Sequence, residues 1–226
     1  MSRFKRYIYD RSKSITRQNI YEFIDQQLSD AKEGDVVLNV GSGGDVEKTI
    51  RRRQAGQGFT VVTVDISPDR NPDIVADIVS FRSSQNFTYV VMSEVLEHIP
   101  EPKKAIDNVY SLLVGGGKLV LTTPFIYPLH DRPHDYYRYT KYGLSYLLKD
   151  FSCCSIVERS GWLEAVFAIQ ARVVREATPH RLLKLSLGVA AIVLYPIAVA
   201  VSRMVRTDYV TSGYLVTCEK AGEVNS

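Results

Sequence analysis

Apolar residues along this chain follow two patterns: short continuous runs and longer stretches with helical spacing. The runs are rich in β-favouring residues and predict buried strands. They lie at about residues 36–40, 60–65, 73–76, 88–92, 118–123, 154–158 and 214–218. Between them, residues 16–31 place Ile20, Phe23, Ile24 and Leu28 on one helical stripe, which predicts a helix that covers a sheet. Strands that alternate with helices predict an α/β fold with a doubly wound, mostly parallel sheet.

Two helix boundaries are marked by residues with capping preferences. Pro102 suits the first turn of a helix that ends near Leu113. Thr140 suits the cap of a helix that runs to about Lys149. In a sheet of this kind, ligands bind at the carboxyl ends of the strands.

The first predicted strand ends in a glycine turn, and the second ends in a carboxylate. VLNVGSGG (37–44) breaks into glycines, which let a backbone approach a ligand closely. VVTVDIS (61–67) closes on Asp65, which is placed to accept hydrogen bonds from ribose hydroxyls. The dinucleotide fingerprint needs a third glycine where the chain has Val46, and a Walker loop is missing from the sequence. The turn therefore suits a nucleoside cofactor that needs no phosphate cradle.

The order of the following motifs resembles the class I S-adenosylmethionine-dependent methyltransferases. Asp77 lies within IVADI (74–78), MSEVLEHIPEP (92–102) follows the fourth strand, and LLVGGGKLVLTTP (112–124) leads into the fifth. The resemblance is to the small-molecule, type 11-like group with an EVLEHIP-type segment, and it covers roughly residues 36–160. It implies a Rossmann-like seven-stranded sheet with an antiparallel last strand, and S-adenosylmethionine as cofactor.

The resemblance also implies a set of cofactor residues at the ends of the first four strands. They are Asn39, Gly41, Ser42, Gly43, Asp65, Ile66, Asp77, Ile78, Ser93 and Glu94. Asp77 would face the adenine amino group. The chain departs from the family at Asn39, where an acidic residue is usual. An amide still accepts a hydrogen bond from the methionine ammonium group, but it lacks the attraction between charges.

The acceptor site is expected after the fifth strand, in PFIYPLHDRPHDYYRYT (124–140), which its prolines mark as a loop. The segment resembles one found in methyltransferases of bacterial surface-glycan pathways. His130 is the candidate general base, because imidazole titrates near neutrality. Asp135 and Arg138 are candidates for orienting His130 or binding the acceptor; alternatively, they pair with each other structurally. His98 is a rival base, and we expect no metal site.

The run LSLGVAAIVLYPIAVAV (185–201) contains no charged residue. As a helix it would measure roughly 26 Å, less than the ~30 Å of a hydrocarbon core. Arg181 and Lys184 precede it and Arg203 and Arg206 follow it, so both ends resemble cytoplasmic flanks. We expect a helical hairpin or in-plane element, with Pro196 as the place where the helix turns back. A buried helix or an oligomer interface is the alternative.

Charge and cysteine usage bear on partners and compartment. The net charge is +3, but basic residues gather near the start of the chain and at 51–53. The first group comprises Arg3, Lys5, Arg6, Arg11, Lys13 and Arg17. No nucleic-acid motif accompanies them, so an anionic membrane surface is the expected partner rather than nucleic acid. Cys153, Cys154 and Cys218 have no metal-ligand spacing and indicate a reducing cytosol rather than a disulfide framework.

These observations predict a basic, helical N-terminal segment (1–35), a methyltransferase core (36–162), a hydrophobic insert (163–206), and a final strand with a tail (207–226). The predicted function is O-methylation of a lipid-linked saccharide or another amphiphilic small molecule. The enzyme would be cytoplasmic, peripheral or monotopic at the inner face of the membrane. A quinone-like lipid acceptor is one alternative. A non-catalytic cofactor-binding membrane adaptor is another, suggested by Asn39.

Overall fold

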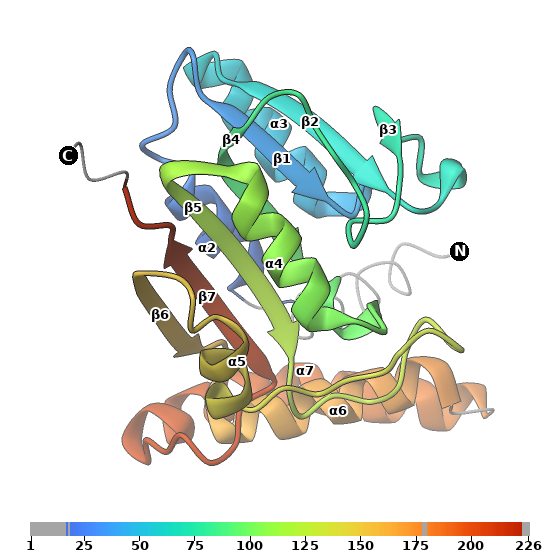
Figure 1. Ribbon diagram of the computed structural model, residues 1–226. Coiled ribbons are helices and arrows are strands. Elements are labelled where there is room, and N and C mark those ends of the chain that lie inside the picture. Colours follow the sequence, from blue (N-terminus) through green and yellow to red (C-terminus); the bar gives the residue numbers. More distant parts are fainter. Residues whose placement is uncertain (1–16, 18, 178–179, 223–226) are drawn as a thin grey trace. The chain divides into compact units, whose positions relative to one another are not determined.

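The computed structural model describes residues 17, 19–177 and 180–222 (Figure 1). The basic residues Arg3, Lys5, Arg6, Arg11 and Lys13 lie outside the described residues. The chain forms two compact units. Of the described residues, we call 20–123, 133–157 and 215–222 the sheet unit, and 17, 19, 124–132, 158–177 and 180–214 the hairpin unit.

A seven-stranded sheet with the order β3-β2-β1-β4-β5-β7-β6 confirms the predicted fold class. Its strands are β1 (Val36–Val40), β2 (Thr60–Asp65), β3 (Ile74–Val75), β4 (Phe87–Ser93), β5 (Leu113–Pro124), β6 (Cys153–Glu158) and β7 (Gly213–Glu219). The β3-β2-β1-β4-β5 ladder is parallel. The β7 arrow points opposite to those of β5 and β6 (Figure 1), so the last strand is antiparallel as expected.

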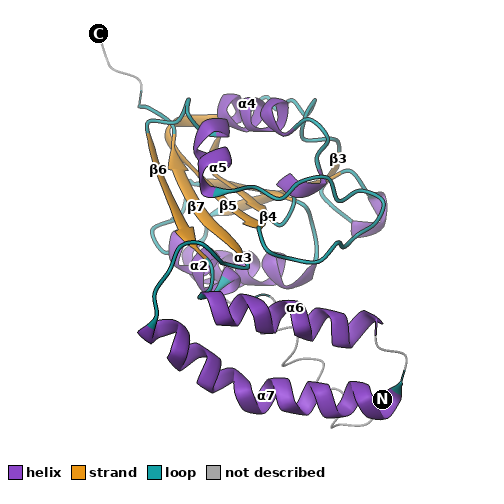
Figure 2. Cartoon of the chain, turned by 90° about the horizontal axis from the view of Figure 1, so that it is seen from below, coloured by secondary structure: helices purple, strands orange, loops and turns teal. Residues whose placement is uncertain are grey.

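Helices cover both faces of the sheet (Figure 2). On one face lie α2 (Ile20–Gln27) and α3 (Gly44–Gln57), and on the other lie α4 (Pro102–Leu112) and α5 (Lys141–Leu147). Ile24, Leu28 and Ile50 pack into one buried cluster with Val37 and Val91 of the sheet. Short 3-10 turns follow β2 (Pro68–Arg70) and β4 (Leu96–His98).

The local boundary predictions hold for α4 and α5 but not for β5. Pro102 begins α4, and the Thr140 hydroxyl accepts a hydrogen bond from Gly143 N at 3.1 Å. The glycines before the fifth predicted strand form part of β5, which already begins at Leu113. Two backbone bonds to Lys220, the residue directly after the last strand, hold this part: Gly116 N donates to Lys220 O (3.0 Å), and Lys220 N donates to Gly117 O (2.9 Å). Pairing with a strand distant in sequence therefore overrides the turn preference of glycine.

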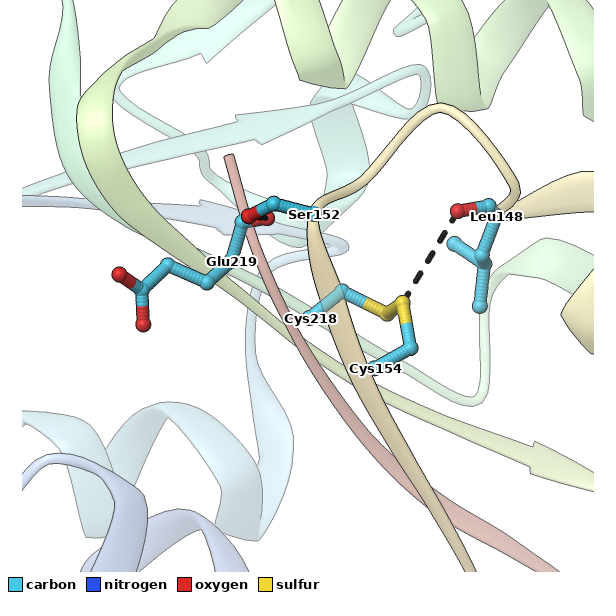
Figure 3. The surroundings of a disulfide bond; sticks show 5 residues. All are labelled: Leu148, Ser152, Cys154, Cys218 and Glu219. Atoms are coloured by element: carbon cyan, nitrogen blue, oxygen red, sulfur yellow. Dashed lines mark hydrogen bonds between the residues drawn. A yellow bond between two sulfur atoms is a disulfide. The ribbon is translucent and has the colours of Figure 1, made fainter. Parts of the chain in front are cut away.

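The structure corrects the expectation drawn from the cysteines. Cys154 of β6 and Cys218 of β7 are joined by a disulfide across neighbouring strands (Figure 3). The two residues are separated by 64 positions, and only the order of the strands brings them together. Cys153 is a free, exposed cysteine.

The insert between β6 and β7 is an antiparallel pair of helices, α6 (Trp162–Ala177) and α7 (Arg181–Met204), which lie side by side (Figure 2). The expected reversal at Pro196 was wrong, since α7 continues through it. Ala191, Ala198 and Ser202 are buried on one side of α7, and the Ser202 hydroxyl accepts from Leu163 N of α6 at 3.2 Å. Pro196 removes one backbone hydrogen-bond donor from α7. The packing of the buried face on either side of Pro196 keeps the helix continuous.

A polar cluster joins the two ends of the helix pair inside the hairpin unit. The Arg159 side chain is buried, and its Nε and Nη2 donate to Oγ (3.2 Å) and O (3.1 Å) of Ser212. Ser160 N donates to Thr211 Oγ1 at 3.2 Å, and the hydroxyls of Ser160 and Ser212 lie 2.9 Å apart. Arg159 N also donates to Gly213 O at 2.9 Å. The chain therefore leaves β6 and enters β7 at adjacent points.

Substitution of Gly161 tests the close packing at the start of α6. A Cβ there would lie 2.5 Å from Ser202 Cβ and 2.6 Å from Glu164 Oε2. Gly161→Ala should therefore lower the free energy of unfolding by about 1–3 kcal/mol and speed hydrogen exchange in α6 and α7. Gly56→Ala is the control, because a Cβ on that exposed α3 residue meets no described atom within 4 Å. Equal stability of the two variants in urea denaturation would contradict the packing argument.

Candidate active site

The glycine turn after β1 is close to Val95 at Gly41 and has open space beside Gly43 and Gly44. Gly41 has φ +84°, and a Cβ there would lie 2.6 Å from Val95 Cγ2, so a side chain cannot fit. Gly43 (φ +84°) and Gly44 (φ +70°) also adopt left-handed conformations, but an added Cβ meets no described atom within 4 Å. The turn therefore packs against Val95 on one side and leaves open space on the other. Gly43 N donates to the Glu47 carboxylate at 2.6 Å, within the same turn and helix.

Asp65, at the end of β2, holds the glycine turn in place. Its Oδ2 accepts from Ser42 N at 2.8 Å, and its Oδ1 accepts from Ser67 N at 2.8 Å. The Ser42 hydroxyl donates to Arg70 O at 3.2 Å, which adds a second link between the two loops. Each carboxylate oxygen has a further lone pair, which can accept from a ligand hydroxyl. Ile66 follows with 71% of its surface exposed.

Asn39 is the residue in this region whose environment points most directly to a ligand. The side chain has 0% exposure, and its Nδ2 donates to Gly41 O at 3.3 Å. Its Oδ1 is buried without a hydrogen-bond partner among the residues that the structure describes. Leaving such an oxygen unsatisfied costs about 1–3 kcal/mol. A donor such as the ammonium group of S-adenosylmethionine would satisfy it, so this position fits the cofactor.

The other predicted cofactor residues follow β3 and β4. Asp77 is exposed and its Oδ1 accepts from Val79 N at 2.9 Å, while Ile78 is buried. The Ser93 hydroxyl lies 2.8 Å from Thr122 Oγ1. All ten predicted positions therefore lie at the carboxyl ends of β1 to β4, which are neighbours in the sheet. Their contacts with the cofactor remain predictions.

Glu94 has a strained backbone at the end of β4. Its φ of 55° is unusual for a residue other than glycine. Thr122 holds this conformation twice: Glu94 N donates to Thr122 O at 2.9 Å, and Thr122 Oγ1 donates to Glu94 Oε1 at 3.1 Å. A strained backbone persists only where surrounding contacts hold it in place, and for Glu94 both of these contacts come from Thr122.

His98, the rival base, is held by the groups around it. Its Nδ1 lies 2.6 Å from His134 O, and its Nε2 lies 3.7 Å from Oε1 of the buried Glu97. Glu97 O in turn accepts from Tyr136 N at 2.9 Å. These contacts tie the segment after β4 to the second part of the loop that follows β5.

Asp135 and Arg138 form an ion pair with each other, as the alternative to a role in the acceptor site predicted. Arg138 donates through Nη1 (2.6 Å) and Nη2 (2.7 Å) to the two oxygens of Asp135. The hydrogen bonds to Asp135 raise the pKa of Arg138 above its usual value, although burial acts in the opposite direction. The roles of Asp135 and Arg138 towards His130 or an acceptor stay predictions.

Tyr139 follows in the same loop. Burial raises the pKa of its hydroxyl, which donates to Leu96 O at 3.1 Å. The Tyr139 ring stacks with that of Tyr137 at 5.6 Å.

His130 belongs to the first part of the loop, inside the hairpin unit. Its ring meets that of Tyr127 edge to face, with centroids 5.4 Å apart and planes at 89°. The guanidinium carbon of Arg172, in α6, lies over the Tyr127 ring at 5.9 Å from its centroid. Sequence analysis missed Tyr127 and Arg172, since nothing in the sequence links α6 to this loop.

Comparison with known proteins gives a family and a fold. A family profile described as a methyltransferase domain matches residues 12–165. Ubiquinone biosynthesis O-methyltransferase from Coxiella burnetii is 29% identical over 142 residues, which are 56% of this chain and 56% of that protein. The chain therefore spans about half the length of the curated relatives it matches.

Two solved structures share the fold at low sequence identity. Phosphoethanolamine N-methyltransferase 2 from Haemonchus contortus, in complex with S-adenosyl-L-methionine, has a TM-score of 0.59 and 15% identity, over 90% of this chain and 52% of that one. A SAM-dependent methyltransferase from Archaeoglobus fulgidus has a TM-score of 0.56 and 15% identity, over 88% of this chain and 94% of that one. The matched profile shows that the chain belongs to the methyltransferase domain family, and these structures, together with the sheet order, show that it has the fold of S-adenosylmethionine-dependent methyltransferases.

Proposed function

We propose that this protein transfers a methyl group from S-adenosylmethionine to a hydroxyl of an amphiphilic small molecule at a membrane surface. The observation that carries the cofactor assignment is the buried Asn39 Oδ1, which lacks a described partner beside the open glycine turn. Asn39 would accept from the methionine ammonium group, Asp65 from the ribose, and Asp77 from the adenine amino group. Bound there, S-adenosylmethionine supplies a methyl group already activated by its sulfonium.

The acceptor side of the proposal rests on His130. A hydroxyl needs to lose its proton during methyl transfer, and an imidazole accepts a proton near neutral pH. His130 would take that proton on a ring nitrogen, while Asp135 and Arg138 would orient it or bind the acceptor. We propose a lipid-linked saccharide as the leading acceptor. A quinone-like lipid is the second candidate, favoured by the similarity to the ubiquinone biosynthesis O-methyltransferase.

The proposed membrane contact rests on α7. We call six of its exposed apolar residues the outer face: Leu182, Leu185, Val189, Val193, Leu194 and Ile197. In the described chain, one helix is long and apolar enough to cross a bilayer, Leu182–Met204, with a mean hydropathy of 2.2; only 22% of that window is buried. A core helix of a soluble protein would be mostly buried. The exposure of the outer face therefore supports contact between α7 and an apolar environment outside the protein.

The cations beside the outer face favour a lipid surface over an apolar protein partner. Lys184 precedes the uncharged run, and the exposed residues Arg203 and Arg206 follow it. Each such cation adds about 1 kcal/mol of attraction near an anionic membrane. The hydrogen bonds between residues 159–160 and 211–213 place both ends of the helix pair together, which supports a monotopic arrangement rather than a single crossing.

Substitution of Asn39 tests the cofactor assignment. Asn39→Asp should bind S-adenosylmethionine about tenfold more tightly, because the hydrogen bond to the ammonium group becomes charge-assisted. The ligand-free variant should unfold more easily, because it buries a charge. Asn39→Leu, which lacks the acceptor at similar volume, should bind more weakly than wild type. Calorimetric titration and thermal unfolding measure these effects, and identical affinities for all three proteins would contradict the assignment.

Substitution of His130 tests the proposed base. His130→Ala should keep its affinity for S-adenosylmethionine and lower the turnover number by roughly 10²–10⁴-fold. The assay follows transfer of a radiolabelled methyl group to membrane-extract lipids. His134→Ala, in the same loop, is the matched control and should keep most activity. Near-normal turnover in His130→Ala would reject the base. Cofactor binding by wild type without transfer to any extract would favour the membrane adaptor.

Aspartates on the outer face test the membrane contact. The Val189→Asp, Val193→Asp double variant should stop sedimenting with phosphatidylglycerol vesicles, because charges oppose insertion of the apolar face. Its unfolding temperature should stay near that of wild type, since both valines are exposed. Val157→Asp, at an exposed valine of β6, is the control. Wild type that never sediments, or a vesicle-free dimer that the double variant dissociates, would contradict the lipid assignment.

A further inference from the structure

We propose that Arg172 of α6 is a positioning residue for His130 and acts through the ring of Tyr127. This inference deepens the proposed function, on which its consequence for catalysis rests. It makes the helix pair a part of the acceptor site as well as a membrane contact. The three side chains and the backbone that carries them all belong to the hairpin unit.

The contacts form a continuous series from helix to imidazole. The Arg172 guanidinium lies over the face of the Tyr127 ring at 5.9 Å, within the range in which a cation is attracted by the ring quadrupole. The same Tyr127 ring meets His130 at 89° and 5.4 Å, the edge-to-face geometry that aromatic pairs favour. A ring held from its face by a cation has a restricted orientation, and its contact restricts the imidazole in turn.

The backbone of the loop is anchored to the base of the same helix pair. Phe125 N donates to Ser212 O at 3.0 Å, and Ile126 N donates to Thr211 O at 3.2 Å. The Phe125 ring also lies 5.6 Å from that of Tyr214. The start of the loop is therefore bonded to the residues that lead into β7, while Tyr127 is held by α6. Residues 124–132 consequently follow any displacement of the helix pair.

Arg172 lies in a mostly apolar helix. It is one of four charged residues of α6, with Glu164, Arg175 and Glu176. Arg172 is only partly exposed, and a charge in such a position needs compensating contacts. The Tyr127 face supplies one of them. A purely solubilising or lipid-binding arginine would not require a tyrosine beneath it.

The functional reason for this arrangement is orientation. A general base works only when its nitrogen is directed at the acceptor proton, and small misplacements reduce rates strongly. By fixing the imidazole through Tyr127, Arg172 would raise the turnover number without touching the acceptor. The position of α6 at a membrane would then influence the orientation of His130.

Two Arg172 variants separate positioning from a general structural role. Arg172→Met should lower the turnover number by about tenfold to a hundredfold, with KM, S-adenosylmethionine affinity and vesicle sedimentation unchanged. Arg172→Lys should recover part of the rate, because an ammonium group also attracts an aromatic face. Lys149→Met is the matched control. It breaks a comparable contact, in which Lys149 lies over the Tyr146 ring at 5.0 Å, outside the loop.

The NMR signals of the His130 ring give a readout that does not depend on activity. In wild type they should report one ring orientation. In Arg172→Met they should shift or broaden, and in Lys149→Met they should not. Unchanged His130 signals in Arg172→Met would overturn the proposal, whatever the activity. Altered signals in a protein whose His130→Ala variant is fully active would support the positioning and reject only the base assignment.

Discussion

The hydrogen bonds of the parallel ladder determine where every candidate cofactor group lies. In this register, Asn39 of β1 is level with Thr63 of β2 and Val91 of β4. Asp65 and Ser93 each lie two residues further along, so side chains distant in sequence come to adjacent strand ends. The Gly41 turn can pack against Val95 because both follow neighbouring strands. A slip of one residue in this pairing would turn these side chains to the opposite face of the sheet.

The helix pair is an insertion that leaves this ladder intact. Its two ends are held together by Arg159 and Ser160 on one side and Thr211 and Ser212 on the other. Burying the Arg159 guanidinium is tolerated because its donors meet the Ser212 hydroxyl and carbonyl. With the ends joined in this way, the length and composition of α6 and α7 can differ from those of a core helix without disturbing β6 or β7.

Much of the fold could be predicted from sequence because the signals are local. Continuous apolar runs, the Thr140 cap and the Gly41 turn depend on neighbouring residues. The Cys154–Cys218 bond, the continuity of α7 through Pro196 and the extension of β5 depend on pairing between distant segments, which periodicity does not contain.

In the candidate site too, the residues with local sequence signals could be predicted and those with distant contacts could not. Asn39 and Asp65 could be found because they lie at the ends of recognisable strands, whereas the unsatisfied Asn39 oxygen became evident only when its burial was known. The pairing of Asp135 with Arg138, three positions apart, was open to sequence reasoning as one of two alternatives. Arg172 was not, because its contact with Tyr127 joins residues that lie far apart in the sequence and in different elements.

The bond between Cys154 and Cys218 gives the C-terminal part of the chain a closed covalent ring. Nearly all of β6, the helices α6 and α7, and nearly all of β7 lie inside this ring. While the bond is formed, a peptide cleavage anywhere in the helix pair leaves both fragments attached to each other. The last strand then cannot diffuse away from its neighbour, so a nick in the helix pair does not release β7 from the sheet.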